Sequence, residues 1–260
     1  MTTPKAPPAQ VRSEVRGGIA YLTLAAPPYN LLTGAMMTDL CAAIAAAQAN
    51  RSLVGVVLTA EGKAFSAGAD VGEHKPEQAP AMIAAFSRLF STIGALDLPL
   101  VAAVHGAALG AGFELALMAD IVVAGERATF GQPEIRLGFF APVGVSWLPA
   151  RIGVARAIEV TATGRTYTAA EMQAMGLVSR VAAADAFEAA VESVLDDLRR
   201  ASPAVMRLNV RTARRLAGRP FEDGHREAER VFLDELMSLA DVREGIASFY
   251  EKRAAVWQNR

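Results

Sequence analysis

The 260-residue chain has only one cysteine, Cys41, and three histidines that lie far apart, His74, His105 and His225. A single thiol excludes an intramolecular disulfide and fits a reducing compartment. Cys41 lies in an apolar, helix-like run without a neighbouring base, which favours a core thiol over a nucleophile. The histidines have no cysteine cluster and no ligand spacing beside them, so the sequence predicts no metal site.

An excess of charge of one sign is also missing. The chain has 26 Lys and Arg against 27 Asp and Glu, and no block of like charges. This balance gives no electrostatic footprint for nucleic acid or for an anionic membrane surface.

No apolar run reaches the roughly 18 residues of a membrane span, because Glu114 and Asp120 interrupt the most apolar region. The first ten residues, MTTPKAPPAQ, hold prolines where a signal peptide would have its apolar core. We therefore expect a soluble, cytoplasmic protein with a disordered tail over residues 1–10.

With 52% hydrophobic residues, the chain can build the core of one large domain. Gly17-Gly18 separates two β-like runs as a hairpin turn, and Thr33 is a plausible cap for an alanine-rich helix through Ala49. Two continuous apolar runs then predict buried strands. A loop of small residues follows each run, and a helix follows each loop. The predicted strands are 11–15, 19–24, 53–59, 99–104, 121–124 and 128–130, with helices over 33–49 and 80–93.

From about Val154 onward the pattern becomes helical and amphipathic. The terminal helices carry more apolar surface than a single exposed helix should show. A subunit interface and packing on their own domain both explain this surface. The helices are predicted over 154–163, 169–175, 185–200, 205–216, 221–239 and 242–256.

The two loops of small residues offer backbone N–H groups that a ligand can approach closely. Gly110, Ala111 and Gly112 open one predicted helix, where the first N–H donors are unpaired and the helix dipole reinforces them. Residues 66–70, SAGAD, form the other loop, and Ala69 and Ala111 occupy comparable places after their strands. If the loops converge, they make an oxyanion hole; the alternative is tight packing of a helix on a sheet.

Other familiar templates fit poorly. Gly110 and Gly112 begin a dinucleotide-binding pattern, but Leu115 replaces its third glycine, and Glu134 follows Pro133 in a loop. There is no phosphate-binding G-x-x-x-x-G-K-[ST] motif and no G-x-S-x-G nucleophile elbow.

Two carboxylates remain as the candidates for chemistry. Glu114 lies one turn inside an apolar helix, where an unpaired carboxylate would be costly, and Glu134 lies in the loop FGQPEIRLG. Singly, Glu134 could be an ordinary surface residue. As a pair beside backbone donors, the two could hold a water and exchange its protons, with burial raising one pKa.

At these residues the chain resembles the enoyl-CoA hydratase/isomerase (crotonase) superfamily. The resemblance implies an α/β fold, a crotonase-like spiral of ββα repeats over 11–200, and a C-terminal helical oligomerisation region over 201–260. It implies an acyl-CoA thioester as substrate, no metal or redox cofactor, and homotrimers that can pair as hexamers. The matching segments are GIAYLTLAAPPYN, EGKAFSAGAD, LPLVAAVHGAALGAGFELALMAD, FGQPEIRLG, MGLVSRV and FYEKRAAVW.

Carried over by position, Ala69 and Ala111 match the residues whose N–H groups bind the thioester carbonyl. Glu114 and Glu134 match the catalytic glutamates of hydratases, with Glu134 expected to deliver a proton to the α-carbon. The residues expected to line the acyl-CoA site are Ala67, Gly68, Asp70, Val71, Gly110, Phe139, Phe140, Phe249 and Lys252.

One stretch departs from the pattern of the common short-chain hydratases. Where they have a glycine-rich turn resembling PGAGGTQRL, this chain has Phe139, Phe140 and Pro142 in LGFFAPVG. Either a different packing of the core side chains or a reshaped acyl pocket would explain the change. LGFFAPVG looks more like hydratases of cyclic dienoyl-CoA esters. The resemblance thus predicts a 2-enoyl-CoA hydratase, with a cyclic dienoyl-CoA hydratase, an isomerase, a C–C hydrolase or an idle acyl-CoA binder as alternatives.

Overall fold

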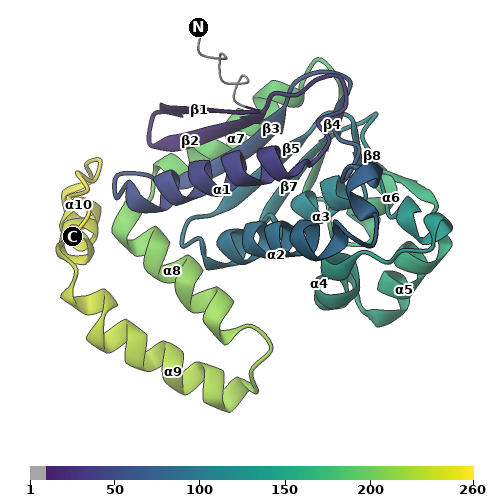
Figure 1. Ribbon diagram of the computed structural model, residues 1–260. Coiled ribbons are helices and arrows are strands. Elements are labelled where there is room, and N and C mark those ends of the chain that lie inside the picture. Colours follow the sequence, from purple (N-terminus) through teal and green to yellow (C-terminus); the bar gives the residue numbers. More distant parts are fainter. Residues whose placement is uncertain (1–9) are drawn as a thin grey trace, which may run out of the picture.

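The computed structural model describes residues 10–260 (Figure 1). The tail predicted over residues 1–10 lies outside the described residues except for Gln10. Two sheets form the framework, and all six predicted strands belong to one of them.

The larger sheet has six strands in the order β1-β2-β3-β5-β7-β10. The antiparallel β1–β2 hairpin turns at Gly17 and Gly18, whose positive φ angles of 52° and 75° suit a tight hairpin turn. From β2 to β10 all pairs are parallel. The strands are β1 (Val11–Arg16), β2 (Ile19–Leu24), β3 (Gly55–Ala60), β5 (Leu100–Val104), β7 (Ile121–Gly125) and β10 (Arg180–Ala182).

The smaller sheet has four short strands in the order β4-β6-β8-β9. Each of its first three strands follows one strand of the larger sheet along the chain, and a helix follows each pair, so the chain winds as a spiral of ββα turns. The predicted fold is confirmed. The strands are β4 (Ala64–Ser66), β6 (Ala107–Leu109), β8 (Thr129–Gly131) and β9 (Thr166–Thr168).

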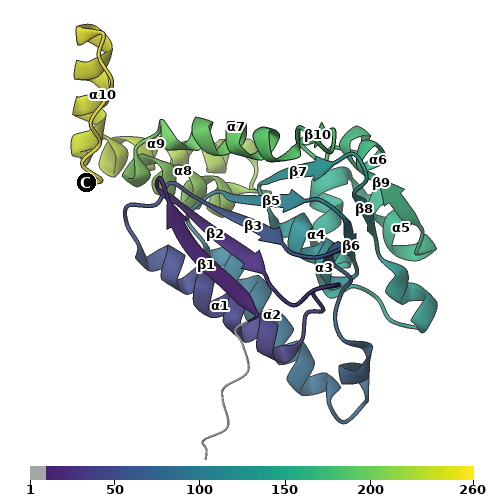
Figure 2. The ribbon, with the colours of Figure 1, turned by 90° about the horizontal axis from the view of Figure 1, so that it is seen from above.

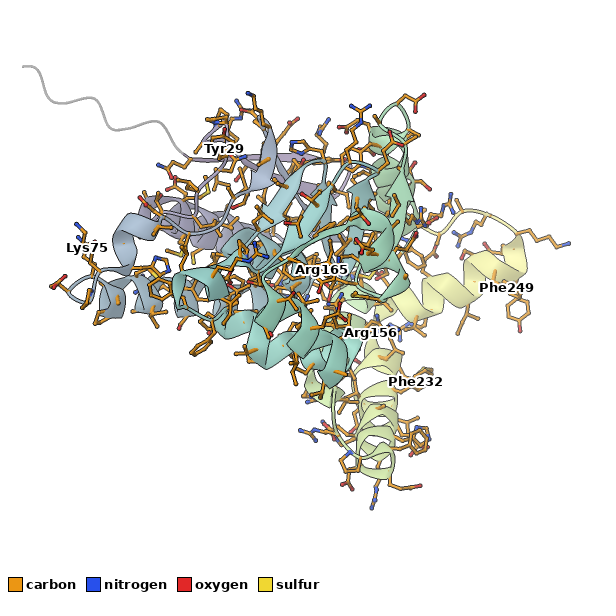
Figure 3. The ribbon with its side chains drawn as sticks, turned by 90° about the vertical axis from the view of Figure 1, so that its right-hand side faces the viewer. Tyr29, Lys75, Arg156, Arg165, Phe232 and Phe249 are labelled. Carbon is orange, nitrogen blue, oxygen red and sulfur yellow. The ribbon has the colours of Figure 1, made fainter. Side chains whose placement is uncertain are left out.

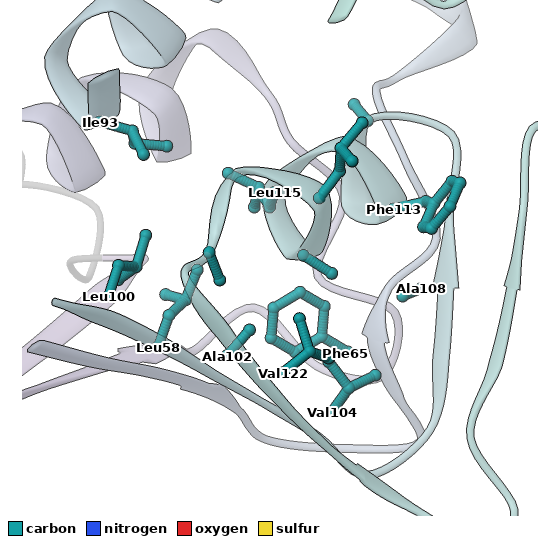
Figure 4. Close-up of a cluster of buried hydrophobic side chains, with 14 of the residues drawn as sticks. Leu58, Phe65, Ile93, Leu100, Ala102, Val104, Ala108, Phe113, Leu115 and Val122 are labelled. Atoms are coloured by element: carbon teal, nitrogen blue, oxygen red, sulfur yellow. The ribbon is translucent and has the colours of Figure 1, made fainter. Parts of the chain in front are cut away.

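Helices cover both faces of the larger sheet (Figure 2). Alternating residues of β2 face opposite ways: Leu22 packs in the cluster with α1 (Gly34–Ala49) and α2 (Ala79–Ala95), and Tyr21 packs against α7 (Phe187–Arg199). The short helix α3 (Ala111–Met118) lies over the middle of the sheet, and its Leu115 packs in the same core as the strands (Figure 4). Cys41 is partly buried against this core, as predicted.

The second half of the chain is mainly helical. The predicted helix over 221–239 ends at Asp234 and continues as a short 3-10 turn, and the last helix ends at Glu251 because Lys252 has a left-handed φ of 53°. A helix over 142–152 was not predicted. The helices are α4 (Pro142–Ile152), α5 (Val154–Thr163), α6 (Ala169–Ala174), α8 (Pro203–Leu216), α9 (Phe221–Asp234) and α10 (Ala240–Glu251), with 3-10 turns η1 (Val71–His74), η2 (Pro133–Leu137) and η3 (Leu236–Ser238).

Three arginines from later helices bind the carbonyl ends of the first three helices. Arg207 of α8 donates to carbonyls at the end of α1 and pairs with the buried carboxylate of Asp97. Arg214 of α8 donates to Ile93 O at the end of α2, at 3.1 Å. Arg151 of α4 donates to carbonyls at the end of α3, at 2.9 and 3.2 Å. Cations suit helix C-termini, so these arginines tie the helical half to the spiral.

Beyond α8, the helices α9 and α10 extend away from the sheets (Figures 1 and 2). Both carry large exposed apolar side chains, and Figure 3 shows Phe232 and Phe249 standing out from them. In residues 10–260 no helix has the length and apolar character needed to cross a membrane.

Candidate active site

The two loops of small residues lie against each other. Strands β4 and β6 pair in parallel, so the loops that follow them leave the same edge of the small sheet. Gly68 (φ 105°) and Gly110 (φ 51°) have left-handed backbones that favour glycine. A Cβ atom on Gly68 would lie 3.0 Å from Leu109 O and 3.6 Å from Ala111 N. The predicted convergence is therefore present, and it depends on the missing side chain of Gly68.

Buried Ser66 fixes the first loop from behind. Its hydroxyl donates to Asn30 O at 2.8 Å and accepts from Gly68 N at 3.2 Å. Gly112 lies so close that a Cβ there would be 2.4 Å from Ser66 O. The loop and the first turn of α3 are thus locked together, with Ala111 at the start of that helix.

Two backbone donors are left over in this arrangement. In the described part of the chain, neither Ala69 N nor Ala111 N donates to another backbone group. Ala111 is the first residue of α3, where the helix dipole adds to the positive potential. Two free N–H groups on touching loops are the geometry of an oxyanion hole.

Glu114 lies in the first turns of α3 and is 1% exposed. Its Oε1 accepts from Val143 N at 2.7 Å and from Gly144 N at 2.8 Å. Both donors belong to the first turn of α4, which begins at Pro142. A helix N-terminus is a natural binding site for a carboxylate, and this explains how an apolar helix accommodates Glu114.

Burial raises the pKa of Glu114 to about 8, because water no longer solvates the ionised form. The two N–H donors oppose this by stabilising the carboxylate, and the nearby Glu134 carboxylate adds to it by repulsion. With this raised pKa, Glu114 can keep a proton at neutral pH, where an ordinary carboxyl group is ionised.

Glu134 enters the site from η2 and is partly buried. Its Oε2 lies beside the second loop, 3.4 Å from where a Cβ on Gly110 would be. Burial raises the pKa of Glu134, while its own N–H and the charge of His74 lower it. With its amide nitrogen turned toward Glu134, the buried side chain of Gln132 donates to both carboxylate oxygens, 3.3 Å to Oε2.

These groups meet at one cavity of about 420 Å³. Ala69, Ala111, Glu114 and Glu134 all line it. The rest of its wall is mostly apolar and comes from α2, η2 and the stretch before α4. Those apolar residues are Val71, Met82, Ile83, Phe86, Leu137, Phe139, Phe140 and Pro142.

Most of the predicted site residues come together here, and three do not. Asp70 does not line the cavity; its side chain accepts from Gly72 N at 2.8 Å and caps η1. Phe249 and Lys252 belong to the end of α10, which points away from the cavity within this chain (Figure 3). The cavity does contain Ala67, Gly68, Ala69, Val71, Gly110, Ala111, Glu114, Glu134, Phe139 and Phe140.

Sequence reasoning missed the donors that hold Glu114. Val143 and Gly144 act through their backbone, so their side chains carry no signal. Pro142 offered one, because proline favours the first position of a helix. His74 was also missed as a lining residue.

Several known proteins are similar to this chain in sequence. The sequence model of the family described as "Enoyl-CoA hydratase/isomerase" matches residues 14–260. The chain is 36% identical to the cyclohexa-1,5-dienecarbonyl-CoA hydratase of Thauera aromatica, over 97% of this chain and 98% of that protein. It is 37% identical to a probable enoyl-CoA hydratase of Rhizobium meliloti, over 95% of this chain and 97% of that one.

Solved structures share the fold. An enoyl-CoA hydratase of Bacillus anthracis superposes with a TM-score of 0.92 at 26% identity, covering 96% of this chain and 100% of that one. A structure from Geobacillus kaustophilus, described as an enoyl-CoA hydratase subunit, gives 0.88 at 31% identity, with 96% and 98% covered.

Proposed function

Because the chain belongs to the enoyl-CoA hydratase/isomerase family, we propose that Glu114 and Glu134 add water to a 2-enoyl-CoA thioester held at Ala69 and Ala111. Relatives named as enoyl-CoA hydratases, at 35–37% identity over 93–97% of the chain, make the protein a hydro-lyase of that type. One observation carries the residue assignment: two carboxylates and two free N–H groups line the same cavity.

The backbone N–H groups of Ala69 and Ala111 would bind the thioester carbonyl oxygen. Water addition at the β-carbon places negative charge on this oxygen as an enolate. Fixed donors stabilise that charge without reorganising, and one such donor is worth about 3–4 kcal/mol. Coenzyme A takes part as a component of the substrate. The protein's own N–H groups and carboxylates bind the carbonyl oxygen and transfer the protons.

Glu114 would hold the attacking water. The first turn of α4 fixes its carboxylate through Oε1, which leaves Oε2 free to accept from water. As water attacks the β-carbon, its oxygen forms the new C–O bond, and a carboxylate of the pair accepts one proton from the water.

Glu134 would give the proton to the α-carbon. Its carboxylate lies next to Gly110, which precedes the oxyanion donor Ala111, so it faces the carbon adjacent to the bound carbonyl. In the free protein, burial raises the pKa of Glu114, so that Glu114 carries a proton. A water in contact with both carboxylates can pass that proton to Glu134 before the reaction.

The test is product analysis with a panel of linear and cyclic enoyl-CoA esters. The wild-type protein should convert at least one ester to a product heavier by one water. Glu114→Gln and Glu134→Gln should each lower kcat by about a thousandfold or more while the ester still binds. Glu188→Gln, on the exposed face of α7, is the matched control and should keep full activity.

The panel also separates the alternatives. An isomerase would shift the double bond with no change in mass. A C–C hydrolase would also add one water but would break a carbon–carbon bond, which fragmentation of the product distinguishes from a new hydroxyl group. An idle acyl-CoA binder would leave every ester unchanged despite tight binding. Conversion without gain of water, or no conversion, would contradict hydration.

A cyclic dienoyl-CoA ester is the second candidate substrate. Two observations favour it: Phe139 and Phe140 line the cavity, and the Thauera relative is named for a cyclic ester. Flat conjugated rings pack well against aromatic side chains. Higher kcat/KM for the cyclic ester than for linear ones would support this choice.

We further propose that α9 and α10 join copies of the chain into trimers or hexamers. Phe221, Phe232, Leu233 and Phe249 are each more than half exposed on these two helices, which is costly for a free monomer. Light scattering on the purified protein measures the assembly directly. The cytoplasmic location stays a prediction from the sequence.

A further inference from the structure

His74 lines the cavity, although the proposed reaction gives it no part. Among residues 10–260, it is the one titratable side chain of the cavity wall besides Glu114 and Glu134. It ends η1, and its Nδ1 lies 3.0 Å from Asp70 O, which holds the ring in place. A linear hydrocarbon chain would offer nothing polar for an imidazole to bind, so another use must explain it.

The ring of His74 packs on the ring of Phe139. Their centroids are 5.0 Å apart and their planes meet at 58°, a favourable tilted arrangement. His74 follows the loop of Ala69, and Phe139 follows the turn that carries Glu134. The contact therefore joins two distant segments of the chain that both line the cavity.

In the proposed reaction this contact would lie on the acyl side of the reacting atoms. The thioester carbonyl would bind at Ala69 and Ala111, and the acyl group would then pass the two glutamates. Phe139 comes directly after η2, and the charge of His74 reaches the carboxylate of Glu134. The His74–Phe139 contact thus stands where the far end of the acyl group would lie.

The cavity is also small for a ligand-binding pocket. Its volume of about 420 Å³ is near the low end of the roughly 300–1,000 Å³ range for ligand pockets. On the opposite wall, Met82 and Phe86 of α2 are buried in the core and cannot easily yield. A longer acyl group would therefore have to displace another lining side chain or separate the two rings.

We propose that His74 and Phe139 act as one closure at the acyl end of the cavity, which restricts the enzyme to compact, ring-sized enoyl groups. The inference rests on the proposed hydratase function and adds a specificity residue to it. A flat conjugated ring fits against two aromatic faces, whereas a long linear chain has to break their contact.

The experiment measures kcat/KM for a cyclic dienoyl-CoA ester and for short-, medium- and long-chain linear 2-enoyl-CoA esters. In His74→Ala and in Phe139→Ala, the ratio of long-chain to short-chain kcat/KM should rise by about tenfold or more, since relief of a steric misfit is worth that much. The double variant should gain little beyond either single change, because each removes the same closure.

Two further variants separate loss of the ring contact from other effects of the substitutions. His74→Phe retains a ring against Phe139 and should keep the wild-type length profile, whereas a polar role for the imidazole would be lost with it. His105→Ala is the matched control: His105 lies outside the cavity, with its Nε2 3.1 Å from Gly62 O.

The outcomes separate the two proposals. A wild-type protein that hydrates no ester would remove the hydratase assignment itself. A wild-type protein that hydrates the short or cyclic ester, with a length profile unchanged in folded His74→Ala and Phe139→Ala, would overturn the closure alone. Circular dichroism and melting temperature establish that each variant is folded.

Discussion

Gly144 donates its backbone N–H to the carboxylate of Glu114 at 2.8 Å. The contact connects the first turn of α4 to the first turns of α3, so one helix end holds a functional group of another. Val143 makes the same bond at 2.7 Å, and both donors favour the ionised carboxylate. The low exposure of Glu114 acts in the opposite direction and prevails.

Glu114 should make the protein less stable as the pH rises. Its folded-state pKa of about 8 exceeds the ordinary value of 4.5, so the stabilising protonated form is fully present below about 4.5 and lost through about 8. Relative to Glu114→Gln, the free energy of unfolding of the wild type should fall across this window. At about 1.4 kcal/mol per unit, the fall is at most about 5 kcal/mol. Urea unfolding at several pH values measures it; parallel curves for the two proteins would contradict it.

His74→Gln should change the pH dependence of activity. The charge of His74 lowers the pKa of Glu134, so its removal raises that pKa. If Glu134 acts as the acid in the enzyme–substrate complex, the alkaline limb of kcat moves to higher pH, because Glu134 keeps its proton to a higher pH. The pH–rate profile of the two proteins decides; His105→Gln, at a histidine outside the cavity, should leave the profile in place. A shift to lower pH would contradict the assigned direction.

Gly68→Ala should damage the oxyanion hole more than the fold. Its φ of 105° disfavours a side chain, and the new Cβ would press on the loop of Ala111. We expect a loss of about 1–3 kcal/mol in stability and at least a hundredfold loss in kcat. Gly176→Ala is the matched control, since its φ is 89° with no atom within 4 Å of the new Cβ. It should lose similar stability but little activity; equal losses of activity in both would exclude a specific role for Gly68.

Arg207→Met should destabilise the protein strongly. The change leaves the buried carboxylate of Asp97 with only the exposed Arg51, 3.8 Å away, and losing a buried partner costs about 3–5 kcal/mol. Asp97→Asn in the same chain should restore part of the loss, because the uncompensated charge is gone. Chemical denaturation measures both. Arg200→Met, at an exposed ion pair with Asp197, should cost less than about 1 kcal/mol, and an equal loss there would contradict the argument.

Long, regular elements could be predicted from the sequence. The hairpin of β1 and β2 follows from Gly17-Gly18 between two β-like runs, and α1 begins where Thr33 caps it through Met36 N. In these segments the spacing of hydrophobic residues and the residues that begin or end the element predict the same secondary structure. The local conformational preference therefore matches the structure in the final fold.

The smaller sheet could be predicted only in part. Of its strands, only 128–130 was expected, although all four have three residues each, too few for a clear period-2 pattern. They form because neighbouring turns of the spiral supply partners. The convergence of the Ala69 and Ala111 loops depends on these short strands. Its sign in the sequence was that Ala69 and Ala111 occupy comparable places after two apolar runs.

Helix α4 escaped prediction because Pro142, Gly144 and Pro149 all disfavour a helix interior. Pro142 stands at its first turn, where proline is tolerated, and tertiary packing supports the rest. The donors that hold Glu114 were hidden with it. The carboxylate pair could thus be found from the sequence, but not the helix end that fixes one of its members.

The stretch from Phe139 to Gly144 has a consequence for how such an enzyme can diversify. Its first two residues line the cavity, and its last two hold Glu114. In the proposed enzyme, six consecutive residues would therefore contribute both to substrate range and to catalysis. Side-chain exchange at Phe139 or Phe140 can retune the range, because the backbone donors stay in register. An inserted or deleted residue would shift those donors, so selection for new substrates should favour replacements here over changes in length.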